Sequence, residues 1–319
     1  MHPALSVIFF TTLSGAGYGL LVWLGISVSM LQTRGSMAPQ LASMQLIAAA
    51  LAIVLVTVGL LCSLGHLGKP QRAWRAMSQW RTSWLSREGV LSLLTYLPAM
   101  AMVFLLWRNE KSADAAALLV IVGMVTAMLA LATIACTAMI YASLKPIPAW
   151  THPLVLPGYL LFALLGGAAL LFLLMLWRLP DAQAAGGLSK ILAVLGVLAA
   201  LLKLLYWRET DRSDPRPARG AAVGLPGREV EVFERPHTEA NFITKEMVFV
   251  VAREHSRRLR RLALGLFAGV PVLAAVAIAL WPKAAAGLFP LTVVCMLAGT
   301  FVERWLFFAE AKHVVSRYY

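Results

Sequence analysis

The segment that follows the second long apolar stretch has the highest density of side chains able to do chemistry. His66 lies between Gly65 and Gly68, with Pro70 beyond them, where a helix must break at the edge of the apolar stretch. Glu88 opens the next apolar stretch on the same side. An imidazole and a carboxyl group can together bind and deliver protons at the polar end of an apolar cleft. We therefore take His66 and Glu88 as candidate catalytic residues.

Aromatic and basic side chains surround this pair in the sequence. Trp84 could form a flat wall for a ring, and Arg72 or Arg87 could limit the cost of a charge on Glu88. A structural interpretation stands beside this one, because a histidine at a helix end and a glutamate in a first helical turn both suit the helix dipole. Arginines are also ordinary membrane anchors. The spacing alone leaves both interpretations open.

The composition indicates that the helices which position these residues lie in a membrane and not in water. Of the 319 residues, 60% are hydrophobic and only 13% are charged, whereas a soluble chain has about 25% charged residues. The mean hydropathy is +0.76. These values exclude a water-soluble enzyme with one core and a disordered chain. The net charge of +13 does not indicate a nucleic-acid partner, because in a membrane protein the useful question is which side carries the charges.

Eight apolar stretches are long enough to cross a bilayer core of about 30 Å as helices. They are Leu5–Leu31, Leu41–Ser63, Gly89–Trp107, Ala115–Tyr141, Leu154–Trp177, Leu188–Trp207, Leu262–Trp281 and Gly287–Phe308. They are too continuously apolar for barrel strands, and the first stretch lacks the features of a signal peptide. The sequence thus predicts an all-α integral membrane protein, with residues 1–319 as a single eight-helix membrane domain.

The basic residues predict the orientation of these spans. Twenty Lys and Arg residues fall on the side of both termini, against six on the other side. The positive-inside rule then places both termini in the cytoplasm. The same side holds the longest loop, residues 208–260, which begins extended at Asp214–Gly220 and becomes helix-like from Thr238 to Arg261. We expect this loop to dock a partner protein, or alternatively to lie on anionic membrane lipids.

Other side chains argue against metal centres and transport. The six histidines all lie at or beyond span ends, and the three cysteines are isolated in apolar runs, so we expect no haem, no iron–sulfur cluster and no other metal. No acidic residue or lysine lies near the centre of a span, which argues against a transporter.

Charged residues near the span ends have simpler interpretations. We expect Lys203 to extend its amine to the membrane surface. Glu303, Arg304 and Glu310 are expected to pair with one another at the interface.

Four motifs resemble the membrane anchor subunits of the dimethyl sulfoxide reductase family. They are the residues from His2 to Gly19, from His66 to Ala73, from Ser83 to Glu88 and from Glu246 to Arg261. The resemblance covers the full chain and implies a multi-pass protein of the bacterial inner membrane. It implies a bound quinone, ubiquinone or menaquinone. It also implies docking to an iron–sulfur subunit with four clusters, which exchanges electrons with a molybdenum catalytic subunit.

Under this resemblance, the family's quinol-site histidine falls on His66 and its functional glutamate on Glu88. Arg72, Trp84, Arg87 and Tyr18 complete the predicted quinone site. Tyr18 belongs to the small-residue run Ser14–Gly19, which indicates either close helix packing or room for the quinone head group.

The family contains both electron-flow directions. The predicted cytoplasmic face resembles the sulfite dehydrogenase arrangement, in which the anchor of a respiratory complex reduces quinone during sulfite oxidation. The alternatives are a quinol-oxidising anchor of a dimethyl sulfoxide-type reductase, and a purely structural anchor without a quinone site. The chain is thus expected to be a quinone-reactive or non-catalytic subunit of an oxidoreductase.

Overall fold

The structure is a computed structural model of the whole chain. It describes residues 4–33, 39–65, 67–108, 112–178, 181–212, 219–231, 233–234 and 251–314. Within these residues every regular element is helical. The longer helices are α1 (Leu5–Thr33), α2 (Pro39–Leu64), α3 (Trp84–Arg108), α4 (Ala113–Ala142), α5 (Val155–Arg178), α6 (Ala182–Arg212), α8 (Val251–Leu264), α9 (Val270–Leu280) and α10 (Ala285–Ala309). The shorter ones are η1 (Pro70–Gln79), α7 (Arg219–Ala222), η3 (Gly265–Gly269) and η4 (Pro282–Ala284).

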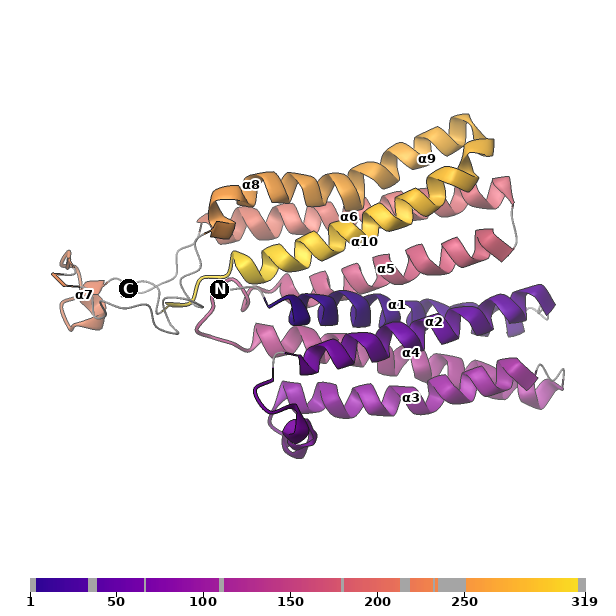
Figure 1. Cartoon of the computed structure of the whole chain (residues 1–319), viewed down its shortest axis with the longest axis horizontal. Helices are drawn as coiled ribbons and strands as arrows, with labels where there is room; N and C mark the ends of the chain where they lie inside the picture. Colours follow the sequence, from indigo (N-terminus) through magenta and orange to yellow (C-terminus); the bar gives the residue numbers. More distant parts are fainter. Residues whose placement is uncertain are drawn as a thin grey trace.

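Eight stretches of the described residues are long and apolar enough to cross a membrane, which confirms the predicted all-α bundle. The seventh span is composite: α8, the single π-helical turn η3 and α9 follow one another along one side of the bundle (Figure 1). Two spans extend well beyond their predicted apolar stretches: α3 begins at Trp84, and α6 continues to Arg212, because polar and charged residues continue these helices beyond the apolar core. α8 begins at Val251, inside the segment that was predicted to be helix-like, and it continues directly into the seventh span.

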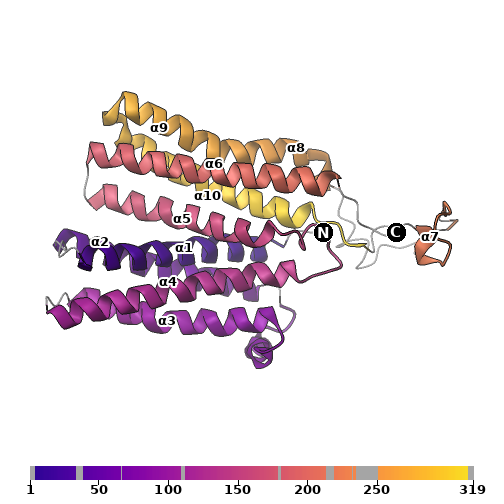
Figure 2. The same ribbon diagram turned by 180° about the vertical axis from the view of Figure 1, so that it is seen from behind.

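Neighbouring spans run in alternating directions, so the helix ends fall into two sets (Figures 1 and 2). One end of the bundle holds the starts of α1, α3, α5 and α8 and the ends of α2, α4, α6 and α10. We call it the basic end, since the long basic loops of the sequence belong to it. The segment η1 lies there beside α3, and α7 lies beyond it (Figure 1). The residues Thr238–Val250 of the predicted docking helix lie outside the described residues, whereas its last part is α8.

Helix α1 is the central element and packs against α2, α4 and α5. A side chain at Gly19 would collide with the backbone of Ala163 on α5, and one at Gly17 would press on Val56 of α2. These glycines allow close approach of helix backbones, as the packing interpretation of the Ser14–Gly19 run expected. Gly15 differs, because nothing lies within 4 Å of the position of its missing side chain.

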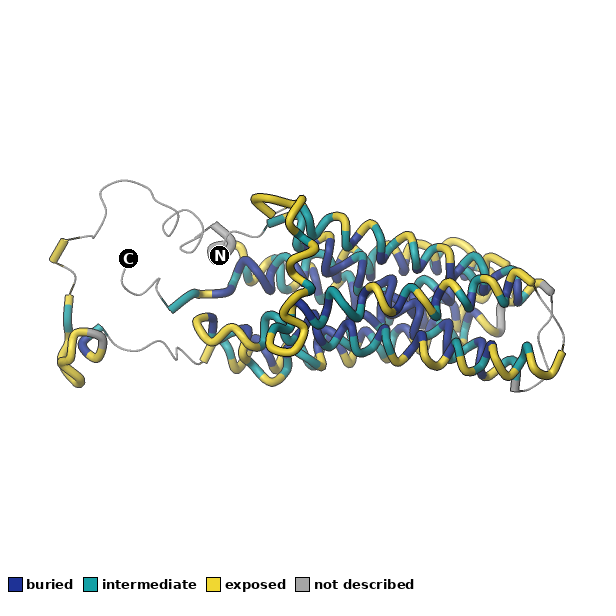
Figure 3. Tube along the Cα trace, turned by 90° about the horizontal axis from the view of Figure 1, so that it is seen from below, coloured by how far each residue is buried: buried dark blue, intermediate teal, exposed yellow. Residues whose placement is uncertain are grey.

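Burial follows the axis of the bundle. Buried residues line the middle, and exposed ones cover the outside along the whole length of the spans (Figure 3). Many of the exposed side chains are large and apolar, such as Leu97 on α3 and Leu273 on α9. Such a surface suits lipid tails, which solvate apolar side chains as well as the bundle interior does.

Candidate functional site

Glu88 lies in the first turns of α3, on the face that packs into the bundle. The buried positions of α3 recur every three or four residues, from Glu88 through Ser92 and Thr95 to Leu106, so the carboxyl group turns inward. Glu88 is only 6% exposed. The Thr137 hydroxyl on α4 donates a hydrogen bond to its Oε1 at 2.7 Å. This inward carboxyl at the basic end is the geometric centre of the candidate site.

Arg87 and Trp84 lie beside Glu88 in sequence but have different partners. The Arg87 guanidinium donates to the carbonyl oxygens of Trp80 at 3.1 Å and Arg81 at 2.7 Å, and it stacks over the Trp84 ring at 4.3 Å. Ser86 adds a hydrogen bond to the Ala76 carbonyl. These contacts brace the loop against the start of α3. The Arg87 charge is therefore directed at loop carbonyl oxygens, whereas the Glu88 carboxyl is directed at α4.

The other predicted site residues are scattered around this end of the bundle. Arg72 is exposed on η1. His66 lies outside the described residues; α2 ends at Leu64, two residues before it, at the same end of the bundle as Glu88. The structure thus places Glu88 and the loop, while the roles of all the predicted site residues stay predictions.

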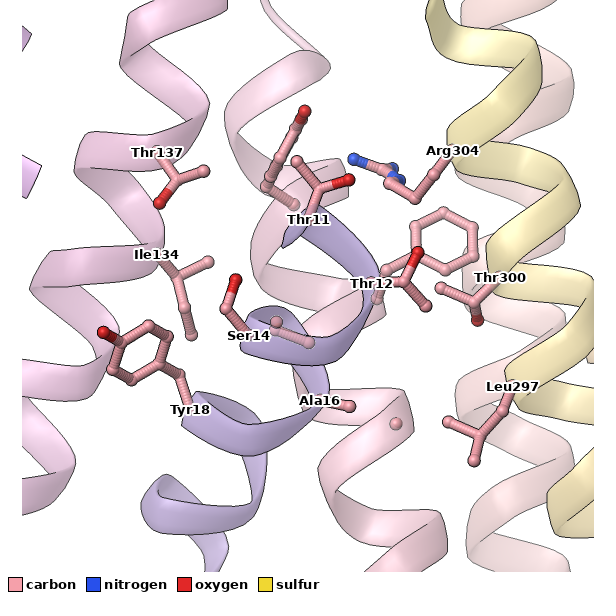
Figure 4. A pocket seen from close by; sticks show the side chains of 15 residues that line it. Thr11, Thr12, Ser14, Ala16, Tyr18, Ile134, Thr137, Leu297, Thr300 and Arg304 are labelled. Carbon is pink, nitrogen blue, oxygen red and sulfur yellow. The ribbon is translucent and has the colours of Figure 1, made fainter. Parts of the chain in front are cut away.

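Tyr18 lines a narrow pocket between α1, α4, α5 and α10 (Figure 4). The cavity volume is about 20 Å³, which is room for about one or two water molecules and too little for a quinone ring. Its polar lining comprises Thr11, Thr12, Ser14, Tyr18, Thr137, Tyr159, Thr300 and Arg304. Because Thr137 both lines the pocket and binds Glu88, the pocket adjoins the candidate site. The Ser14–Gly19 run had indicated room for a quinone head group at this place, and the structure has a pocket there that is too small for one.

A buried ionic cluster lies across the pocket from Glu88. The Lys203 amine pairs with Glu303 Oε1 at 2.7 Å, and Arg304 Nε pairs with Glu303 Oε2 at 2.6 Å. Lys203 is only 4% exposed, so the expectation that its amine reaches the membrane surface is wrong. In the low-dielectric interior, the Glu303 carboxylate attracts the amine more strongly than it would in water. The sequence did contain a signal for this pair, because Lys203 and Glu303 have opposite charges and lie inside two predicted spans.

Glu310 has a different partner from the one expected. Glu303 does pair with Arg304, but Glu310 accepts hydrogen bonds from Arg260 on α8, at 2.8 and 3.0 Å. Arg260 also binds Asp211 at the end of α6, at 2.6 and 3.0 Å. Burial raises the pKa of the Glu310 carboxyl, against the opposing effect of Arg260. This fork ties α6, α8 and α10 together at the basic end.

The Glu88–Thr137 pair, the pocket and the ionic cluster together form a polar layer inside the bundle. An aromatic cluster covers this layer on the side of the basic end. It comprises Tyr141, Trp150, Tyr159, Phe307 and Phe308, with ring centroids 5.2 to 5.9 Å apart. Trp150 comes from the loop between α4 and α5, and its indole donates to the Phe307 carbonyl at 3.0 Å. Tyr141 and Phe307 lie about one helical turn nearer the basic end than Thr137 and Arg304. The rings thus lie between the pocket and the aqueous side where α4, α5 and α10 enclose it.

Comparison with known proteins gives one consistent result. The family model described as DMSO reductase anchor subunit (DmsC) matches residues 1–309. A subunit of the sulfite dehydrogenase of Allochromatium vinosum, the one lettered C, is 33% identical over 337 aligned positions, which cover 100% of this chain and 99% of that protein. Both matches span the eight helices and the polar layer described above. The chain therefore belongs to the family of the DMSO reductase anchor subunit, and it is a membrane anchor subunit of a molybdoenzyme complex.

Proposed function

We propose that this anchor binds quinone at the basic end and exchanges electrons between the quinone pool and an iron–sulfur subunit docked there. The iron–sulfur subunit, with four clusters, would connect the anchor to the molybdenum catalytic subunit. The single observation that carries the proposal is the buried carboxyl of Glu88, which opens a transmembrane span beside the loop of His66. A passive anchor has no need of an inward carboxyl group at that place, since desolvating it is costly.

The chemistry that the chain must supply is proton exchange. Reduction of a quinone to a quinol takes up two electrons and two protons, and oxidation releases them. His66 would hydrogen-bond one quinone oxygen and exchange a proton near neutral pH. Glu88, held by Thr137, would store the proton that His66 gives or receives. The ring would lie on the loop side of Glu88, because the pocket behind Thr137 is too small for it.

We infer that electrons flow toward quinone, as part of sulfite oxidation. This direction is supported by the similarity to the sulfite dehydrogenase subunit of Allochromatium vinosum over the full length of both chains. The excess of basic residues on the side of the large loops supports a cytoplasmic position for the docked subunits. A quinol-oxidising reductase anchor remains the competing function, and the description of the matching family model favours it.

The test uses the whole complex and two activities. We expect His66→Ala to leave assembly and the reaction with a soluble dye unchanged, while quinone-linked activity falls about 100-fold or more. Glu88→Gln should act in the same direction with a smaller loss. The matched controls are His255→Ala and Glu229→Gln, which change exposed residues on the same side. Unchanged quinone kinetics and unchanged binding of a quinol-analogue inhibitor in His66→Ala would show that the anchor is structural only.

The direction of electron flow needs a separate measurement. The wild-type complex in proteoliposomes is given sulfite and a water-soluble quinone, and quinol formation is followed. In the reverse assay it is given quinol and dimethyl sulfoxide. Quinol formation from sulfite supports the proposed direction. Consumption of quinol with dimethyl sulfoxide alone would assign the reductase function.

A further inference from the structure

Thr137 joins the candidate site to the pocket behind it. Its single hydroxyl hydrogen has two acceptors, Glu88 Oε1 at 2.7 Å and the Thr133 carbonyl oxygen at 3.1 Å. When Glu88 is ionised, the hydroxyl donates to it. When Glu88 is protonated, the carboxyl can donate to Thr137 Oγ1, whose own hydrogen then turns to Thr133. Thr137 can therefore hold Glu88 in both protonation states without losing a hydrogen bond.

The pocket on the other side of Thr137 has the lining that a water molecule needs. Thr12, Tyr18 and Tyr159 line it. The Thr12 hydroxyl is buried without a hydrogen-bond partner among the described residues, whereas the Tyr18 hydroxyl lies close to Ser92 and the Tyr159 hydroxyl close to Arg304. Buried polar groups in native proteins are nearly always satisfied, and a buried water typically has two to four polar partners. The volume of about 20 Å³ holds about one or two waters. The pocket thus has the size and polarity that suit ordered water. It is too small and too polar for an apolar ligand.

Charged groups stand at the far side of the same pocket. Arg304 lines it from α10 and stacks over the Tyr159 ring at 4.2 Å (Figure 4). Arg304 is bonded to Glu303, which in turn holds Lys203. Since two cations share one carboxylate, the cluster carries a net positive charge. Such a charge disfavours a protonated water in the pocket and directs a proton toward the Glu88 side.

We propose that this pocket is a water site that returns protons to Glu88 through Thr137, a role that rests on the proposed quinone chemistry. When Glu88 gives up its proton, the Thr137 hydroxyl passes one to it and receives one from the pocket water. The pocket water regains a proton from the aqueous phase at the basic end along the α1 side, to which the aromatic cluster contributes no residue. Thr11 lies about 9 Å along α1 from the start of that helix at Leu5, so the remaining distance is short.

The test compares isosteric variants of buried threonines on one helix. Thr137→Val removes the hydroxyl and keeps the shape, and Thr137→Ser restores the hydroxyl. The control is Thr126→Val, also buried on α4, where the hydroxyl donates only to the Val122 carbonyl of its own helix among the described residues. Each variant is purified in the whole complex. Dye-linked activity, quinone-linked kcat and KM, and the pH profile of kcat are measured.

We expect Thr137→Val to lower quinone-linked kcat about tenfold or more, with KM and dye-linked activity unchanged. The kcat of this variant should fall further as the pH rises, because Glu88 must then take its proton directly from solvent, where protons become scarce. Thr137→Ser should recover most of the loss, and Thr126→Val should behave as wild type. Wild-type kcat and pH profile in Thr137→Val, together with a loss in His66→Ala, would overturn the water site and leave the proposed function standing. No effect in His66→Ala and Glu88→Gln would overturn the proposed function instead.

A direct observation covers the case in which Thr137→Val does not assemble. An experimental map of the wild-type complex that resolves waters elsewhere in the bundle should show water density in this pocket, within hydrogen-bond distance of Thr137 or Thr12. A pocket without such density would overturn the proposal. Recovery of assembly in Thr137→Ser is expected in either case, because the serine hydroxyl can still bind Glu88.

Discussion

Lys203 Nζ lies 2.7 Å from Glu303 Oε1, and the two side chains are 4% and 0% exposed. The pair joins α6 to α10 inside two membrane spans. Arg304 takes the other oxygen of the same carboxylate at 2.6 Å. A desolvated charge is costly unless it is paired, so each of the two cations depends on Glu303. The carboxylate is therefore the central member of the cluster.

Removing the shared carboxylate should cost far more stability than removing one cation. Glu303→Gln leaves Lys203 and Arg304 buried together without a counter-charge, and we expect a loss of about 3–5 kcal/mol in the free energy of unfolding. Lys203→Met leaves the neutral pair of Glu303 and Arg304, and should cost about 1 kcal/mol. Thermal unfolding of the detergent-solubilised protein measures both. Equal losses in the two variants would contradict the shared-carboxylate arrangement.

The close contact of α1 and α5 should tolerate no side chain at Gly19. A methyl group there would collide with the Ala163 backbone, so Gly19→Ala should force the helices apart and cost about 1–3 kcal/mol. Gly187→Ala on α6 is the control, because nothing lies within 4 Å of its added carbon. It should be neutral or stabilise the helix by up to about 1 kcal/mol. Expression level and melting temperature of the two variants check this prediction.

The exposed arginines of α8 should contribute to docking of the iron–sulfur subunit. Arg257 and Arg258 are exposed, whereas Arg260 is engaged with Asp211 and Glu310 and must be left intact in the test. We expect Arg257→Glu with Arg258→Glu to weaken co-purification of the partner about tenfold, more so at low salt.

Charge reversal at the opposite end of the bundle supplies the control for docking. Lys190→Glu with Lys283→Glu should leave co-purification unchanged, because both residues lie at the other helix ends. Deletion of Ala221–Arg235 from the long loop should also weaken assembly. Full assembly in the arginine double variant and in the deletion would place the docking surface elsewhere.

The orientation in the membrane can be read with reporter fusions. Reporters after Tyr319 and within Pro215–Gly227 should show a cytoplasmic position, since the basic residues gather on that side. Reporters near Ser36 and Ala113 should show the far side. The reversed pattern would place the large loops outside and remove the argument for cytoplasmic partners.

The amino-acid sequence by itself determined the number and type of the main elements. A bilayer core sets the length of an apolar helix, so eight long apolar runs were enough to predict eight spans, and the structure has them. Turn residues after α2 and the polar start of α3 likewise marked the loop of the candidate site. The end of α6 escaped prediction, because charged residues can continue a helix beyond the membrane where hydropathy has no signal.

Only the tertiary structure decided which buried polar groups meet. Hydropathy does not report the rotation of a helix about its axis, because lipid and protein interior are similarly apolar. Packing of α3 against α4 brings Glu88 to Thr137, and packing of α6 against α10 brings Lys203 to Glu303. Each pair is distant in sequence, and its members share no motif. The number and length of the spans follow from the thickness of the apolar membrane core. The contacts among the buried polar groups follow from how each helix is rotated and packed.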